Sequence, residues 1–356
     1  MGAPRATLIR KVGFWFGAGW WRVPWYASDS LRTIATRATG AGPGEADSRQ
    51  PILPAREQAP ELIPPVGGVT WRVAGDARLF AGSGYALMLQ VMHPSVGAGV
   101  SQFSNFKEDP WGRLLRTLDY TSSVIYGGPE LAWDIGRRVR EMHKHIKGTR
   151  PDGERYHALE PRAYAWVHAT LAEAIIRAHR AFCSPQISDD EVEVFWREWR
   201  RAGRLVGVRY DDLPESWPDL LAYFDEMVEG ELEDTEAAQD VLAALFDPAA
   251  PPLPWLREGI WRVVRWPSMK AGSLATVGLL PPVLRERLGV EWGPSQARRF
   301  RLLARATRAS RPLLPPQAKN FGPNYLRWRR EAIARRDVAS GSGRGDRAHD
   351  GAAAAA

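Results

Sequence analysis

Three polar side chains in the first half of the chain have the types and the spacing to bind a cofactor. Arg113 and Thr117 are four residues apart, which places them on one face of a helix, and His143 follows in the next long helical segment. One imidazole can ligate a haem iron axially, and a guanidinium can pair with a haem propionate. A single His on a helix is more often a packed or exposed residue, so the spacing alone leaves both interpretations open.

The sequence lacks the motifs of several other enzyme classes. It contains no His-Glu-x-x-His pattern, no phosphate-binding loop and no nucleophile elbow. Cys183 is the only cysteine, which excludes an internal disulfide and a Cys-rich metal site. His143 and His145 are two residues apart and face different sides of a regular helix, so they cannot share one metal ion. A pocket with a single axial His therefore remains as the candidate.

The helices that would position these side chains have clear start and stop signals. The segment "DARLFAGSGYALMLQVM" predicts a buried helix that ends before His93, because a following proline disfavours the helical backbone. Asp109 is the expected N-cap of a helix that runs to the glycine pair 127–128. The next helix is expected to begin after that pair and to end at Gly148.

Helical patterns dominate the rest of the chain as well, and strand signals are nearly absent. A long helix is expected from Pro161, and Ser188 with Glu191 forms a capping box. We therefore predict an all-α fold, a single large helical domain that encloses a pocket. The expected organisation is an irregular N-terminal arm over residues 1–68, the domain over 69–337 and a disordered tail over 338–356.

Composition and charge limit the classes of partner that the protein is expected to bind. The net charge of +7 is modest for 356 residues, and no basic stripe with interleaved aromatic residues points to nucleic acid. No apolar run reaches about 18 residues, so no transmembrane helix is expected. The segment "RKVGFWFGAGWWRVPWYA" joins basic and Trp side chains, which predicts either peripheral attachment to the cytoplasmic face of a membrane or packing on the domain.

Several ordered motifs resemble one family. They are "LMLQVMHPSVGAGVSQFSNFKEDPWGRLLRT", a Tyr-Gly turn at 126–127, "VREMHKHIKG", "GERYHALEPRAYAWVHATL", "LPESWPDLLAYFDEM", "LLPPVLRERLGVEW" and "RPLLPPQAKNFGPNYLRW". Together they resemble the oxygenase MpaB family, which shares its catalytic domain with the rubber oxygenase called latex-clearing protein. The resemblance extends from about Trp71 to Trp328.

The resemblance implies a haem b site with iron as its metal. It assigns Arg113 and Thr117 to the site and makes His143 the axial ligand, since the family's His stands five residues before the glycine. His93 is either a haem contact or a helix-end residue. Where rubber-cleaving relatives have Lys before the Thr, this chain has Arg116, a poor iron ligand that could instead orient oxygen.

The implied function is a haem-dependent oxygenase that uses O₂ on a hydrophobic small molecule or polymer, such as an isoprenoid or a lipid, with cleavage of a C=C bond as one reaction. Two alternatives stay open. The first is a haem-binding sensor or carrier without turnover, and the second is a membrane-surface interaction protein without a cofactor. The expected location is the cytoplasm, with or without peripheral membrane attachment.

Overall fold

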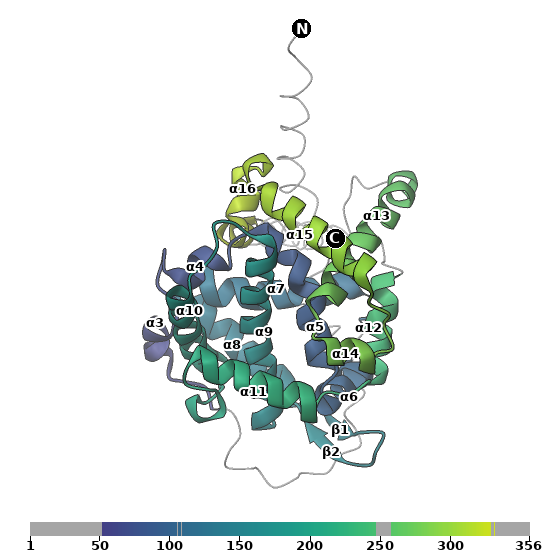
Figure 1. The fold of residues 1–356 in the computed structure, drawn as a ribbon. Coiled ribbons are helices and arrows are strands. Elements are labelled where there is room, and N and C mark those ends of the chain that lie inside the picture. Colours follow the sequence, from purple (N-terminus) through teal and green to yellow (C-terminus); the bar gives the residue numbers. More distant parts are fainter. Residues whose placement is uncertain (1–51, 105, 108, 247–257, 329–330, 332–356) are drawn as a thin grey trace, which may run out of the picture.

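The computed structural model describes residues 52–104, 106–107, 109–246, 258–328 and 331, and this part of the chain is almost entirely helical (Figure 1). The predicted all-α fold is confirmed. The N-terminal aromatic segment and the tail at 338–356 lie outside the described residues. The elements are α3 (Ala59–Leu62), α4 (Val69–Val73), α5 (Ser83–Val91), α6 (Pro94–Phe103), α7 (Pro110–Tyr126), α8 (Pro129–His143), β1 (Lys147–Thr149), β2 (Arg155–His157), α9 (Pro161–Phe182), α10 (Asp189–Ala202), α11 (Trp217–Gly230), α12 (Glu236–Phe246), α13 (Glu258–Leu279), α14 (Pro282–Arg287), α15 (Pro294–Ala309) and α16 (Pro316–Lys319).

Local signals in the sequence determine where the helices around the site begin. Helices α6 to α9 each have proline at their first position, where the missing N–H would have no partner inside the helix. The Asp109 carboxylate accepts a hydrogen bond from the backbone N–H of Gly112 at 2.8 Å and caps α7, as predicted. The capping box of Ser188 and Glu191 at the start of α10 is also confirmed.

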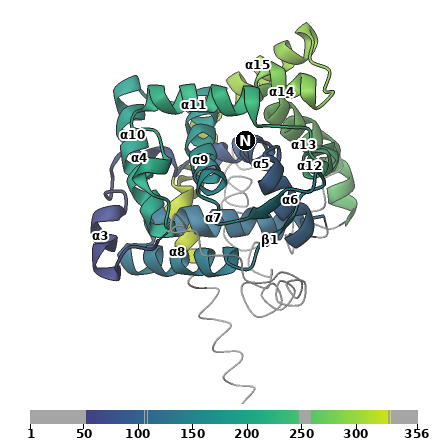
Figure 2. The same cartoon turned by 90° about the horizontal axis from the view of Figure 1, so that it is seen from below.

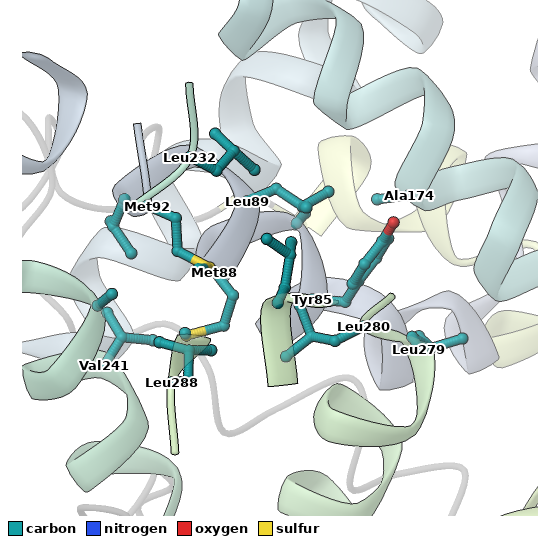
Figure 3. Close-up of a cluster of buried hydrophobic side chains, with 14 of the residues drawn as sticks. Tyr85, Met88, Leu89, Met92, Ala174, Leu232, Val241, Leu279, Leu280 and Leu288 are labelled. Atoms are coloured by element: carbon teal, nitrogen blue, oxygen red, sulfur yellow. The ribbon is translucent and has the colours of Figure 1, made fainter. Parts of the chain in front are cut away.

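Helices α5 and α9 form the centre of the molecule. The side chains of Tyr85, Met88 and Leu89 on α5 have no solvent exposure, and a helix that is apolar on all sides must be enclosed by others. Figure 3 shows this part of the core, in which α5 packs against residues from α9, α12, α13 and α14. On the other side, α9 packs on α10 through a second aromatic cluster. The site described below lies against this rigid centre.

The helix that carries His143 ends earlier than expected. Helix α8 ends at His143, and Gly148 belongs to a short antiparallel hairpin in which it pairs with Tyr156, so the predicted helix end was wrong. The small size of glycine suits this position for another reason. A Cβ at position 148 would lie 2.5 Å from Oε1 of Gln102 on α6, closer than real side chains approach. Close packing of the hairpin on α6, which depends on distant residues, therefore decides where the helix stops.

The described part of the expected N-terminal arm packs on the domain. Ala59 in α3 is 1% exposed, and the indole of Trp133 on α8 donates a hydrogen bond to the carbonyl of Pro54 at 3.2 Å. This part of the arm therefore wraps the helical core. Among the described helices, none is long and apolar enough to span a bilayer.

Candidate functional site

A cavity of about 580 Å³ lies between the central helices and α7, α12 and α13. Apolar side chains from these helices make up most of its wall, and a smaller number of polar residues interrupt it. Cavities of this size and character are typical of small-molecule and cofactor sites. The polar residues of the wall include Ser83, Gln90, Lys107, Arg113, Thr117, Thr121, Ser122 and Thr276.

Helix α7 supplies one whole side of the cavity. Its lining residues recur at intervals of three and four, which is the repeat of one helix face. Arg113 and Thr117 lie on this face, as their spacing predicted. The Thr117 hydroxyl donates to the carbonyl of Arg113 at 3.3 Å, which leaves its oxygen lone pairs available toward the cavity.

The guanidinium of Arg113 has no carboxylate partner among the described residues. Its Nη1 donates to the hydroxyl of Ser104 at 3.3 Å, and burial together with the neighbouring charge of Arg116 lowers the pKa of Arg113 to about 10. Glu108, which is near in sequence, lies outside the described residues. A partly buried cation without an anion is costly, so this position favours a negatively charged ligand group.

Arg116 occupies a different position from Arg113. It does not line the cavity, and its Nη1 lies 3.9 Å from a carboxylate oxygen of Asp109 at the start of the same helix. The Arg116 side chain is 30% exposed, so this contact is a weak surface pair. Its assignment to oxygen orientation stays a prediction that the geometry of the cavity wall does not favour.

His143 is the last residue of α8 and has the hydrogen bonding of a metal-binding imidazole. Its Nδ1 lies 2.7 Å from the carbonyl of Val139, and because a carbonyl only accepts, Nδ1 carries the proton. Among the described residues, no side chain or backbone group bonds Nε2, which therefore keeps its lone pair. Burial lowers the pKa of His143, so the ring is neutral at pH 7. The Tyr164 ring packs edge-on against it at 5.6 Å between centroids.

The hairpin of α7 and α8 brings Arg113 and His143 together. The two helices run antiparallel from the turn at 127–128, and Figure 2 shows them side by side. The positive charge of Arg113 contributes to the lowered pKa of His143, which places the two groups within electrostatic reach. His143 itself does not line the cavity. Arg113 is thus the residue that both lines the cavity and lies within electrostatic reach of the His143 imidazole.

The two other predicted histidines are separate from this pair. His145 lies beyond the end of α8 and is exposed. His93 is the N-cap residue of α6, but its side chain makes no capping hydrogen bond. It is 7% exposed, does not line the cavity, and its pKa is lowered by burial. The nearby charges belong to Glu231 and Glu160 as well as to Arg150 and Arg162, and not to the Arg113 pair.

Gln90 is a cavity residue that sequence reasoning missed. It is 8% exposed on α5, lines the cavity, and its Nε2 donates to the hydroxyl of Thr170 at 3.3 Å. A single polar residue inside the apolar run "LMLQVM" was a signal that could have identified it. In the described part of the chain, no group of three or more His, Cys, Asp or Glu side chains could hold a metal ion.

Comparison with known proteins gives one family match. The family model described as "ER-bound oxygenase mpaB/B'/Rubber oxygenase, catalytic domain" matches residues 71–309, a range that contains Arg113, Thr117 and His143. Two relatives are "Uncharacterized protein Mb2261" of Mycobacterium bovis and "Uncharacterized protein Rv2237" of Mycobacterium tuberculosis. Each is 26% identical over 248 residues, which cover 68% of this chain and 92% of the relative. No solved structure matches the chain.

Proposed function

Because the chain belongs to the family of ER-bound oxygenases mpaB/B′ and rubber oxygenases, as the sequence motifs predicted, we propose that it is an oxygenase that depends on haem b. Its substrates are O₂ and a hydrophobic molecule of the isoprenoid or lipid type. Bound haem supplies the iron that activates O₂ for attack on a C=C bond. The protein supplies the axial ligand, the anion-binding group and a dry, apolar cavity.

The observation that carries this proposal is the pair formed by Arg113 and His143. A guanidinium with no carboxylate partner among the described residues suits a propionate carboxylate. A neutral imidazole whose Nε2 has no described partner suits a haem iron. The carbonyl of Val139 fixes the ring orientation through Nδ1, as hydrogen bonds behind metal-binding histidines do. The donor set therefore fits haem.

The cavity determines the kind of substrate. Its apolar side chains from α5, α7 and α13 cannot form hydrogen bonds with a polar substrate. They therefore favour a hydrocarbon chain and exclude water. Thr117 and Gln90 are two of the polar groups in the cavity wall that could orient a small ligand such as oxygen or a single functional group of the substrate. Oxidative cleavage of an isoprenoid C=C bond is the reaction that this combination of cofactor and cavity would serve.

Two measurements test the proposal. Absorption spectra with pyridine-haemochrome analysis should show haem b in the purified protein, and oxygen consumption should rise when a polyisoprenoid or an unsaturated lipid is added. Loss of haem in His143→Ala with retention in His145→Ala would support the assigned ligand. A protein that stays colourless after expression with added haem would overturn the proposal. Haem without substrate-dependent oxygen uptake would instead identify a sensor or carrier.

A further inference from the structure

Helix α13 has one side in the cavity wall and the other side in solvent. Trp261, Met269 and Thr276 line the cavity from its inner side. On the opposite side, Val263 is 74% exposed and Trp266 is 61% exposed, with Ile260 one turn earlier at 43%. These three residues follow at three-residue intervals, so they share one side of the helix. Three large, exposed apolar side chains within seven residues form a patch, whereas exposed apolar residues on ordinary surfaces occur singly.

The cavity reaches the surface along this same helix. Ser268 and Gly272 are both exposed and both line the cavity, and a Cβ at Gly272 would meet no atom within 4 Å. They lie one turn apart, directly after Trp266. Part of the cavity wall is therefore exposed on α13 within two turns of Trp266. A hydrophobic ligand that entered there from a bilayer in contact with this helix would cross little water.

Exposed basic side chains outnumber acidic ones on α13 and α15, where Glu258 at the start of α13 is the one acidic residue of the two helices. Arg262 and Lys270 are exposed on α13, and the Lys270 ammonium lies 3.7 Å from the centroid of the Trp266 ring. The neighbouring helix α15 contains no acidic residue. Its exposed arginines form no ion pair with a described residue, and exposed Leu302 lies among them. These arginines are Arg298, Arg299, Arg301 and Arg305.

From this combination we infer that the outer side of α13, with α15 beside it, docks on an anionic lipid bilayer and holds the cavity mouth against it. Trp and Lys side chains favour the headgroup region, and unpaired basic side chains favour anionic lipid. A second copy of the chain would bring like charges together. The membrane contact is argued without the proposed function. Only the statement that an apolar substrate enters through this mouth rests on that function.

A single fluorescent label tests this contact directly. Cys183 is buried and burial raises its thiol pKa to about 12, so a cysteine introduced at an exposed position is labelled selectively. Val263→Cys in the full chain places the dye on α13. Val66→Cys is the matched control, because Val66 is 78% exposed and lies between α3 and α4 in the chain. Figures 1 and 2 show α3 on the opposite side of the molecule from α13.

With vesicles that contain anionic phosphatidylserine, the dye at 263 should shift to the blue and be quenched by spin-labelled lipid, and the dye at 66 should not change. Vesicles of pure phosphatidylcholine, or high salt, should weaken the response. In co-sedimentation, Val263→Glu with Trp266→Glu should bind anionic vesicles at least about tenfold more weakly than Val66→Glu, since two buried apolar side chains are lost.

Three results would overturn the inference. The first is equal responses at 263 and 66, and the second is unchanged binding of the double Glu variant. The third is loss of binding only when Trp20→Glu and Trp21→Glu alter the N-terminal segment. The haem spectrum of each variant separates the two proposals. If the Soret band is intact but α13 does not contact vesicles, the oxygenase proposal still holds and the membrane inference fails. If α13 contacts vesicles but the protein never binds haem, the membrane inference still holds and the oxygenase proposal fails.

Discussion

His168 and His143 lie in two regions of the molecule that differ in what surrounds the imidazole ring. In the α9–α10 core, His168 is 4% exposed, stacks on Trp199 at 5.2 Å between ring centroids, and its Nε2 donates to the Trp199 carbonyl at 3.0 Å. Its remaining nitrogen is fully buried and has no partner among the described residues. At the end of α8, His143 is half-buried, also bonds a carbonyl, and keeps Nε2 accessible beside the charge of Arg113.

Burial and a lowered pKa therefore do not distinguish a ligand from a structural histidine, because both residues have them. What differs is access to the second nitrogen and the charge next to it. The core around His168 is packed so closely that a Cβ at Gly203 would lie 2.7 Å from the imidazole Nε2. Beside His143, Arg113 instead lines an open cavity and has no carboxylate partner among the described residues, which suits a site for a charged ligand group.

The largest expected effect separates the two histidines by substitution. His143→Ala should lose nearly all bound haem, measured as Soret absorbance per protein, and keep the helix content of the native chain. His168→Ala should keep haem in the folded protein but lower the free energy of unfolding by ~2–4 kcal/mol, because it leaves a hole in a packed core. Loss of haem in His168→Ala with full retention in His143→Ala would reverse the comparison.

Acidification should act through His168 more than through an exposed histidine. Burial lowers its pKa to about 4, whereas the unfolded chain binds the proton near pH 6.5. The stability is therefore complete above pH 6.5 and is lost as the pH falls toward 4, by about 3 kcal/mol. Urea unfolding of the native chain and of His168→Gln, at pH 7 and pH 4.5, should show a smaller pH difference in the variant. Equal differences would contradict the assignment.

Arg113 sharpens the comparison because no described carboxylate pairs with its guanidinium, which bonds only the Ser104 hydroxyl among the described residues. Arg113→Met should weaken haem binding by roughly tenfold or more, since a charge-assisted bond to a carboxylate is lost. The haem-free variant should be at least as stable as the haem-free native chain, because an uncompensated charge is removed. Haem titration and thermal unfolding of both proteins measure these effects. A large loss of haem-free stability would show that Arg113 has a structural role instead.

Thr117 should give the smallest effect. Thr117→Val keeps the shape of the side chain and removes only the hydroxyl, whose bond to the Arg113 carbonyl contributes about 1 kcal/mol at most. Haem should remain bound, while the oxygen affinity or the turnover with substrate changes by a few-fold. Thr121→Val, one turn further along the same cavity wall, is the matched control. Identical behaviour of the two variants would remove Thr117 from the site.

Much of the fold followed from local chemistry. The start of α7 at Asp109 and Pro110, and its end before two glycines, are written in adjacent residues, so they could be predicted. The alignment of Arg113 with Thr117 follows from helix geometry alone. The end of α8 could not be predicted, because Gly148 pairs with Tyr156 in the hairpin and packs against Gln102, which is 46 residues away in the chain. The choice of His143 as axial ligand, and the roles of Arg116 and His93, stay predictions.

By itself, the sequence determined the family, the all-α fold and the two residues of α7 that face the cavity, because caps, periodicity and motifs are short-range. Only the tertiary structure decided that no described carboxylate pairs with Arg113 and that Gln90 reaches the same cavity. It also decided that α13 has an exposed apolar side near the mouth of that cavity. The physical reason is that burial and pairing depend on groups brought together from distant parts of the chain, whereas a local pattern records only which side chains are available.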